Sequence, residues 1–382
     1  MQASTESTPT AVHIGTIFIA IELSQKTWLV TLHSPDRDRI SRHKLEGGDH
    51  VGLLALIEKV RARAAEKLGS APRVMSCYEA GYDGFWLHRL LQAAGITNFV
   101  FDAASIAVEQ RSRRAKTDRI DGELMLRTLM AYLRGEPRVV RIVRVPSVAE
   151  EDARRASRER DRLVKEQTAH TNRIKALLRL LGVAVGTPRR RNWLTWLAQQ
   201  RDWQGQPLPP HLLAEIKREH ARLLLLREQI AALEQAQVAE TSAVPAVMSE
   251  RRRFLQRLKA LGPAFSATLV NEVFYKDFRN RREVAAYCGL APSPWKSGGI
   301  DVEQGISKAG NHRARQKAIE LAWLWLRHQG DSALSQWFRN RTANAGKRAR
   351  RIAIVALARK LIVALWRYLS TGLVPDQATL KA

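Results

Sequence analysis

The character of the sequence changes at Val148. From residue 14 to about 145, short runs of β-branched and apolar residues alternate with segments whose apolar residues recur every three or four positions. Such alternation of strands and amphipathic helices predicts an α/β domain with a mixed sheet. After Val148 the strand pattern stops and a long, charged helical pattern begins. We therefore expect an α/β domain followed by a mainly helical remainder.

The α/β part is expected to start with a β-hairpin. The run from Gly15 to Val30 is rich in β-branched residues, and the segment from Thr31 to Leu45 is the predicted partner strand. The other expected elements are helices at 52–68 and 84–94 and strands at 74–78 and 98–101.

After Val148 there are two seams, which are sets of residues that recur at alternating three- and four-residue steps and so lie along one face of a helix. They predict a pair of helices that pack through these faces. The prolines between Pro188 and Pro210 separate the two seams, so the helices are expected to pair as an antiparallel hairpin or with another copy. The seam residues are Leu163, Gln167, His170, Ile174, Leu177 and Leu181, then Ile216, His220, Leu223, Ile230 and Leu233.

The remainder, from Leu255 to about Leu369, is expected to be mainly helical, with Gly and Pro clustered only between Gly289 and Gly310. Its tryptophans at core spacing, Trp323, Trp325, Trp337 and Trp366, are expected to pack inside. The predicted organisation is a mobile polar lead-in at 1–14, an α/β domain at 15–147, a coiled-coil helical hairpin at 148–242 and a helical domain at 243–375.

The charge indicates a polyanionic partner. The 382 residues include 63 Lys and Arg against 37 Asp and Glu, a net charge of +26, while 45% hydrophobic residues exclude a disordered polycation. A membrane is not expected, because the longest apolar stretches are short or, at Ile352–Leu369, contain Arg359 and Lys360. No signal peptide is expected. Cys77 and Cys288 are too far apart in sequence for a zinc motif, so a reducing cytoplasm fits.

Four acidic residues could share divalent metals. Asp118 and Asp121 lie three residues apart in a predicted first helical turn, with Thr117 as its N-cap, although acids there also simply complement the helix dipole. Glu22 lies inside the apolar run IAIELS and Glu79 directly follows the strand VMSCY. An acid in an apolar strand is costly unless it is paired or coordinates a metal, with solvent exposure at a strand end as the alternative. Two hard cations held by these acids would suit phosphodiester chemistry.

The segment around Ser297 is a second candidate site. Ser297 precedes Gly298 and Gly299, which would let a backbone approach a phosphate and leave the hydroxyl exposed on a flexible loop. Ser307, followed by Lys308, is the second choice of nucleophile. The alternative is that both serines are only turn residues between helices.

Basic clusters recur in all three regions of the chain and predict a long phosphate-tracking surface, although each cluster alone is typical of a solvated face. They are Arg111–Arg119, Arg189–Arg191, Arg251–Arg253 and Lys347–Arg351. The residues expected to bind nucleic acid are Arg111, Arg113, Arg114, Lys116, Arg119, Arg251, Arg252, Lys296, Lys308, Asn311, Arg313 and Arg315. The segment Leu258–Val273 is expected to form a helix–turn–helix of the kind that contacts a nucleic-acid backbone.

Several long motifs together resemble the transposases of the insertion sequence 110 family. They are RRAKTDRIDG, YEAGYDGFW, GLAPSPWKSGG, EQGISKAGNHRARQKAIELAW and ALARKLIVALWRYL, and the resemblance extends from about residue 15 to 375. It implies an RNase H-like, RuvC-like N-terminal domain, a coiled-coil linker and a mainly α C-terminal transposase domain.

The resemblance also implies roles for residues. The acidic tetrad falls on Glu22, Glu79, Asp118 and Asp121, which would bind Mg²⁺ or alternatively Mn²⁺, and the catalytic serine falls on Ser297. The family's first acid is usually Asp, so Glu22 is either a functional variant or a weaker ligand. The implied partners are double-stranded DNA, a structured noncoding guide RNA and further copies of the chain, with the acids of one subunit assisting the serine of another. The implied location is the bacterial cytoplasm, at the nucleoid.

Two other functions remain open from the residues alone. One is a metal-dependent nuclease or junction resolvase in which the acids direct water attack and Ser297 is a loop residue. The other is a degenerate, non-catalytic nucleic-acid-binding protein in which Glu22 marks lost metal affinity.

Overall fold

The computed structural model describes residues 15–37, 39–106, 118–188, 190, 192–239, 245–297 and 300–381, without the side chains of 118–120, 237–239, 295–297 and 300–304. The chain divides into two compact units, Met1–Val145 and Pro146–Ala382. Each unit is built around its own buried apolar residues.

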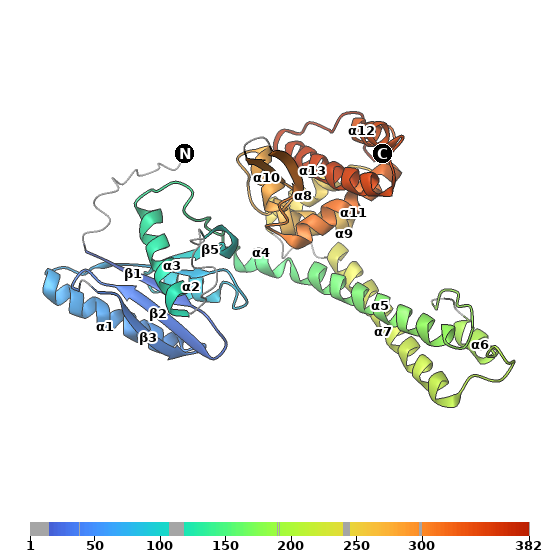
Figure 1. The fold of residues 1–382 in the computed structure, drawn as a ribbon, viewed down its shortest axis with the longest axis horizontal. Helices are drawn as coiled ribbons and strands as arrows, with labels where there is room; N and C mark the ends of the chain where they lie inside the picture. Colours follow the sequence, from blue (N-terminus) through green and yellow to red (C-terminus); the bar gives the residue numbers. More distant parts are fainter. Residues whose placement is uncertain are drawn as a thin grey trace. The chain divides into compact units, whose positions relative to one another are not determined.

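The first unit contains a five-stranded mixed sheet in the order β3-β2-β1-β4-β5 (Figure 1). Strands β1, β2 and β3 are antiparallel neighbours, whereas β4 is parallel to both β1 and β5. The α/β prediction is confirmed for this unit. The strands are β1 (Thr16–Glu22), β2 (Thr27–His33), β3 (Ser41–Glu46), β4 (Arg73–Glu79) and β5 (Thr97–Phe101).

Helices cover both faces of this sheet, which explains why β1 is apolar at almost every position. Ile17, Ile19 and Ile21 pack with α1 (His50–Leu68) and α2 (Trp86–Ala93). Phe18 and Ala20 point to the opposite face and pack with α3 (Asp118–Leu133). The expected helices at 52–68 and 84–94 and strands at 74–78 and 98–101 are confirmed within two residues.

The prediction of one strand over Gly15–Val30 and a second over Thr31–Leu45 was wrong. A turn after Glu22, in which the Ser24 hydroxyl donates to the carbonyl of Thr27 at 2.6 Å, divides the first run. The second run is broken before β3, where Asp36 accepts hydrogen bonds from Arg63 of α1 at 2.9 and 3.4 Å. The chain leaves the sheet there because a tertiary partner fixes that carboxylate.

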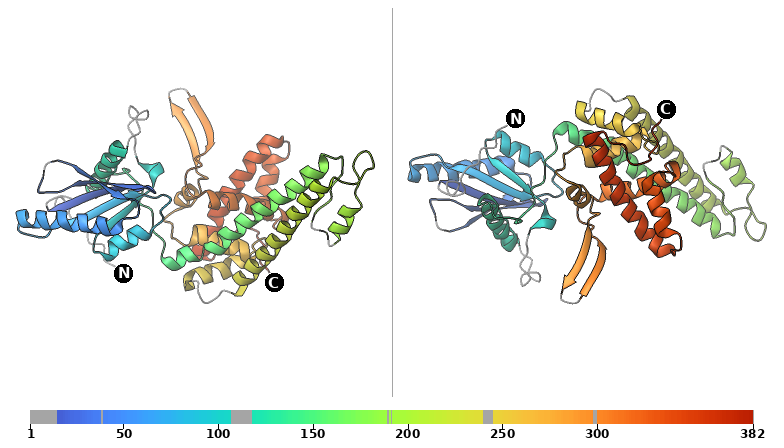
Figure 2. Two further views of the ribbon diagram at one scale, coloured as in Figure 1. Left: turned by 90° about the horizontal axis from the view of Figure 1, so that it is seen from below. Right: turned by 90° about the horizontal axis from the view of Figure 1, so that it is seen from above.

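The second unit begins with α4 (Val148–Asp152) and a long pair of helices, α5 (Arg155–Arg179) and α7 (Pro210–Ala239) (Figure 2). Ion pairs Arg160–Glu234 and Arg173–Glu215 join them, so the two helices run antiparallel. Of the two pairings left open by the sequence, the structure has the hairpin within one chain. Its core includes α6 (Trp193–Ala198) and the seam residues Ile174, Leu177, Ile216 and Leu223.

The remaining residues form a helical bundle with one β-hairpin. Its largest fully buried side chain is Trp325, and the last helix, α13 (Lys347–Thr371), contributes buried residues along most of its length. The elements are α8 (Ala246–Gln256), α9 (Pro263–Leu269), the π-helix η4 (Val270–Phe274), α10 (Arg281–Tyr287), β6 (Pro292–Ser297), β7 (Ile300–Ile306), α11 (His312–His328), α12 (Ala333–Thr342) and α13 (Lys347–Thr371). The helix–turn–helix expected over Leu258–Val273 was wrong in its first half, because residues 258–262 are not helical and the helices of this segment, α9 and the π-helix η4, both follow Gly262.

Two other expectations for this bundle were wrong. The segment around Ser297 was expected to be a loop between helices, but β6 and β7 form an antiparallel hairpin. Gly-Gly followed by β-branched residues is a hairpin signal. Trp323 was expected in the core but is 51% exposed, because Leu321, Ala322 and Trp325 already supply the inward face of α11.

Candidate active site

Glu22 and Glu79 end two neighbouring parallel strands. Ile21 of β1 and Tyr78 of β4 are the last partners in the register, and each glutamate is the next residue. Side chains alternate along a strand, so both glutamates point to the face that bears Ala20 and Cys77, the face covered by α3. Burial raises the pKa of the Cys77 thiol, and the charge of Glu79 raises it further, as expected for a carboxylate on the same face.

Helix α3 crosses the sheet just before these strand ends. Thr31, Ala20 and Cys77 are neighbours in register across β2, β1 and β4. A Cβ at Gly122 would lie 2.4 Å from the Thr31 hydroxyl oxygen, and the Cys77 thiol lies 3.7 Å from the Met125 carbonyl. The helix therefore touches the sheet two residues before the glutamates, and only glycine permits this approach.

The predicted aspartates lie in the first turn of the same helix. Asp118 is its first residue and its side chain is outside the described set, while Asp121 is half-buried and directly precedes Gly122. Among the side chains that are described, no three of His, Cys, Asp or Glu are grouped closely enough to hold a metal ion. The four-acid site therefore stays a prediction. The donor set is all carboxylate oxygen, which suits Mg²⁺ and Mn²⁺.

Ser297 lies at the tip of the β6–β7 hairpin and Ser307 at its base. Ser297 is the last residue of β6 and pairs in register with Ile300, although its side chain is outside the described set. The Ser307 amide donates to the Ala291 carbonyl at 2.8 Å, and the Lys308 amide donates to Gly289 at 3.1 Å. Figure 2 shows the hairpin extending away from the helices of its own unit.

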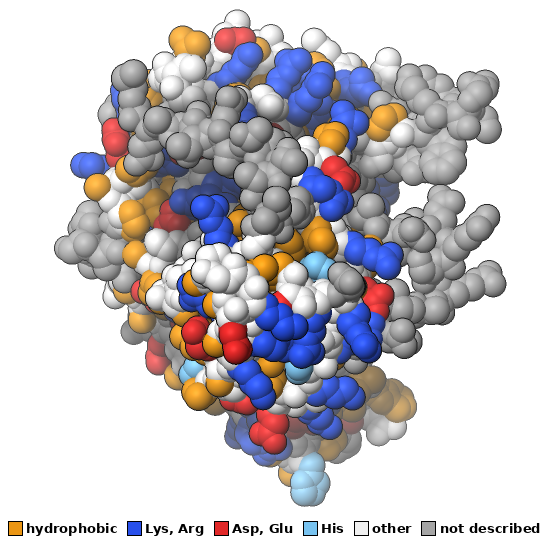
Figure 3. All heavy atoms as spheres, turned by 90° about the vertical axis from the view of Figure 1, so that its left-hand side faces the viewer, with side chains coloured by type: hydrophobic (Ala, Val, Ile, Leu, Met, Phe, Trp, Pro, Cys, Tyr) orange, Lys and Arg blue, Asp and Glu red, His pale blue; other side chains and the backbone are white. Residues whose placement is uncertain are grey.

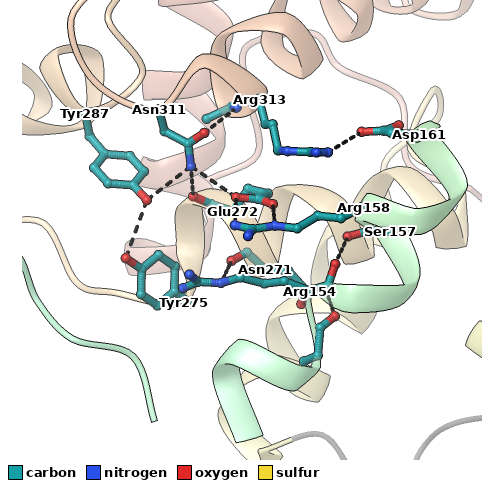
Figure 4. Close-up of polar contacts among 12 residues, drawn as sticks. Arg154, Ser157, Arg158, Asp161, Asn271, Glu272, Tyr275, Tyr287, Asn311 and Arg313 are labelled. Atoms are coloured by element: carbon teal, nitrogen blue, oxygen red, sulfur yellow. Dashed lines mark hydrogen bonds and ion pairs between the residues drawn. The ribbon is translucent and has the colours of Figure 1, made fainter. Parts of the chain in front are cut away.

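The base of this hairpin rests on a buried polar cluster that the sequence reasoning missed (Figure 4). Glu272, 2% exposed on the π-helix η4, accepts from Arg158 of α5 at 2.8 and 3.2 Å and from the Asn311 amide nitrogen at 3.1 Å. That nitrogen also lies 3.3 Å from the Tyr287 hydroxyl. Asn311 caps α11 as well, since its oxygen accepts from the Ala314 amide. The sequence signal that could have revealed this cluster is Glu272 itself, an acid inside the mainly apolar run LVNEVF, comparable to Glu22 in IAIELS.

The charges in this cluster are stabilised by their partners. Burial by itself raises the pKa of Glu272, but the hydrogen bonds and charge of Arg158, with Asn311, outweigh burial and hold that pKa below its ordinary value. Arg154, 7% exposed, donates to the Asn271 carbonyl at 3.0 Å and stacks on the Tyr275 ring at 4.0 Å. A π-helix at such a cluster is typical of functional sites.

Comparisons with known proteins identify the family of this chain. Residues 20–182 match a family model of the IS110 DEDD transposase, and residues 252–337 match the model described as Transposase IS116/IS110/IS902 family. The candidate transposase y4rJ of Sinorhizobium fredii is 47% identical over 98% of this chain and 97% of its own length.

The chain belongs to the IS110 family of transposases. It is thus an insertion-sequence transposase, an enzyme class that cuts and rejoins DNA. A second Sinorhizobium fredii protein, the candidate transposase y4qE, is 26% identical over 81% of this chain and 71% of its own length. The transposase for insertion sequence element IS1111A of Coxiella burnetii is 28% identical over 60% of this chain and 62% of its own length.

Several residues that were predicted to bind nucleic acid make contacts within the transposase itself. Arg251 donates to the Phe274 carbonyl and to Asp277, and Arg252 donates to the Asn271 side chain at 2.8 Å. Arg313 pairs with Asp161 at 3.3 Å, and Arg315 donates to the Lys308 carbonyl at 2.8 Å. Asn311 belongs to the cluster described above, and Lys308 is exposed.

The side chains of the other members of that predicted set lie outside the described part of the structure. Arg111, Arg113, Arg114 and Lys116 of the transposase lie outside the described residues, as do the side chains of Arg119 and Lys296. In the part of the chain that is described, no helix is long and apolar enough to cross a membrane.

Proposed function

We propose that this transposase exchanges the DNA strands of its insertion element through a covalent intermediate on Ser297. The observation that supports this is the position of Ser297 at the end of β6, separated from β7 by two residues, at the tip of a hairpin. A hydroxyl at such a tip can approach a backbone phosphate without a clash from the surrounding helices. The base of the hairpin, in contrast, is held by hydrogen bonds to α10 and the loop that follows it.

The proposed step is a transesterification. The Ser297 oxygen forms a bond to phosphorus while one phosphorus–oxygen bond of the DNA strand breaks, the serine proton leaves to an acceptor, and the departing DNA oxygen takes up a proton. In the rejoining step a DNA hydroxyl attacks the phosphoserine, and Ser297 recovers its proton. Energy of the phosphodiester is conserved, so rejoining needs no other cofactor.

The acidic residues have a separate role in this proposal. Glu22, Glu79, Asp118 and Asp121 hold divalent cations, Mg²⁺ or alternatively Mn²⁺, which would stabilise charge on the phosphate as strands are exchanged. The support is that Glu22 and Glu79 end adjacent strands on the face that α3 covers, and that α3 begins with the two aspartates. Glu22 has one methylene more than aspartate, which a flexible site can accommodate.

The partners follow from the family and from the charge. An element-encoded noncoding RNA pairs with target and donor DNA, and the acids of one subunit assist the serine of another within a homo-oligomer that acts at the bacterial nucleoid. The net charge of +26 supports extensive contact with nucleic acid.

The deciding experiment traps the intermediate. Cells that carry the complete element with its noncoding ends are denatured rapidly, and DNA is tested for covalently attached transposase. We expect adducts with the wild type, none with Ser297→Ala, and fewer with Asp118→Ala, while Ser307→Ala serves as the matched control that keeps them. Cleaved DNA without adducts in any variant would replace this proposal with metal-directed water attack.

A mixing experiment tests the shared site. Ser297→Ala and Asp118→Ala chains are co-expressed, and adducts are compared with those from each variant alone. Restored adducts support acids and serine acting from different subunits. Adducts no more abundant than with Asp118→Ala alone would show that both must lie on one chain. Supplying the noncoding RNA separately to an element that lacks it tests the guide in the same assay.

A further inference from the structure

Four cations follow one face of α5. Arg155, Arg158, Arg162 and Lys165 are spaced by three, four and three residues, which places them on one side of a helix. The stripe is about 15 Å long, from ten residues at 1.5 Å each. None of the four belongs to the apolar core that α5 shares with α7.

The stripe forms one wall of a groove within the second unit. The groove has a volume of about 520 Å³, and Arg313 of α11 adds a fifth cation to its lining. Among the described residues, the carboxylates that line it are Glu151 and Glu159. The groove therefore carries a positive excess and is open to an extended anion.

Two of its arginines are oriented by carboxylates beneath them. Arg158 uses Nε and Nη2 to bind Glu272, which leaves Nη1 available, and its side chain is 43% exposed although Glu272 is only 2% exposed. Arg313 binds Asp161, which also binds Lys317 at 3.0 Å. Figure 4 shows both arginines held in this way. An arginine held in place loses less side-chain entropy when it binds a ligand.

Two other groove cations, Arg155 and Arg162, have exposed ion-pair partners. Arg155 pairs with Asp152 at 3.2 Å, both side chains being more than 70% exposed, and Arg162 lies 3.6 and 3.9 Å from Glu166 and Glu159. Exposed pairs of this kind contribute little free energy and exchange readily for a stronger anion.

We propose that this groove binds the phosphodiester backbone of duplex DNA. A stripe of about 15 Å is long enough to face more than one consecutive phosphate along a DNA strand. The two oriented arginines fix the register and the exposed cations follow the backbone. This site assists binding by the proposed recombinase, but it does not depend on the identity of the nucleophile.

The test measures duplex DNA binding as a function of salt, with full-length Ser297→Ala protein so that no covalent adduct forms. Arg155→Ala with Arg162→Ala should weaken binding about tenfold at moderate salt and reduce the slope of log affinity against log salt by about 1.8, for two lost phosphate contacts. The control, Lys217→Ala with Arg218→Ala on exposed positions of α7, removes the same charge and should leave the slope unchanged. Equal effects of both pairs, or none, would overturn the proposal.

Two further arms separate the alternatives. Duplex RNA of the same sequence is measured in parallel, and a loss confined to RNA would overturn the assignment to DNA. Asp161→Ala raises the net charge by one, so a patch acting only by charge would bind DNA more tightly, whereas loss of the oriented Arg313 should weaken binding a few-fold. Because binding is the readout, failure of the adduct experiment would leave these results interpretable.

Discussion

Arg158 donates from Nε and Nη2 to both carboxylate oxygens of Glu272, 114 residues further along the chain, at 2.8 and 3.2 Å. The pair joins the long helix α5 to the π-helix that supports the base of the β6–β7 hairpin. Asn311 donates to the same carboxylate and caps α11, directly after the hairpin. One buried charge thus links three elements of the second unit.

Glu272→Gln should lower the free energy of unfolding of the second unit by about 1–2 kcal/mol, because the change removes the buried carboxylate that pairs with Arg158, while the 43% exposure of that arginine lets water screen part of the loss. Chemical denaturation measures this. Asp152→Asn, which breaks the exposed pair with Arg155, is the matched control and should cost less than about 0.5 kcal/mol. Similar costs for the two variants would contradict the importance of burial.

Asp36 makes the first unit sensitive to acid. Burial raises the pKa of Asp36, but hydrogen bonds from Arg63 and Ser34 and the charge of Arg63 lower it to about 2. Because the folded pKa lies below the ordinary 3.8, the stabilisation is present above about pH 4 and is lost as the pH falls toward 2. We expect ionised Asp36 to stabilise the folded state by about 1 kcal/mol, because Arg63 is partly exposed and water screens the pair. The free energy of unfolding of Asp36→Asn, measured by denaturation at pH 5.5 and 3, should depend less on pH than that of the wild type by about this amount. An unchanged pH dependence would refute the prediction.

Gly122→Ala should displace α3 from the sheet and reduce transposition, because its Cβ would lie 2.4 Å from the Thr31 hydroxyl oxygen. The second-site change Thr31→Ala removes that oxygen, which accepts and donates no hydrogen bond among the described residues. The double variant should therefore regain part of the lost stability and activity. A double variant as impaired as Gly122→Ala alone would show that the contact does not limit the approach.

Leu223→Asp should unfold the α5–α7 hairpin, since Leu223 is fully buried in the core of that hairpin. Leu177 lies in the same core, so a charge at either position acts on the hairpin within one chain. Leu225→Asp is the control, because Leu225 is 54% exposed. Circular dichroism and limited proteolysis should show loss of helix only for Leu223→Asp.

The two cysteines report separately on the two units. Burial raises the pKa of Cys77 in the first unit, and raises that of Cys288 in the second to about 12. Neither thiol should react with iodoacetamide at pH 8 while its unit is folded. Glu272→Gln should accelerate labelling of Cys288 and leave Cys77 unchanged, as mass spectrometry can measure. Fast labelling of both in the wild type would contradict the burial.

Local patterns were sufficient where neighbours in sequence are also neighbours in the structure. The helical spacing at 52–68 and along α5 predicted helices that form with small shifts in their ends. The acid in IAIELS was noticed because a buried charge needs a partner. Glu272 lies in a similar run, but its partners are 114 and 39 residues away, so no local signal named them.

The sequence by itself determined the two kinds of architecture, the basic character and, through its motifs, the family, because periodicity, charge and motif order are properties of the chain. Only the tertiary structure decided that α5 and α7 pair within one chain, that Ser297 ends a strand, and that Arg158, Glu272 and Asn311 meet. These depend on contacts between distant segments, whose free energies arise from burial and geometry that no local pattern records.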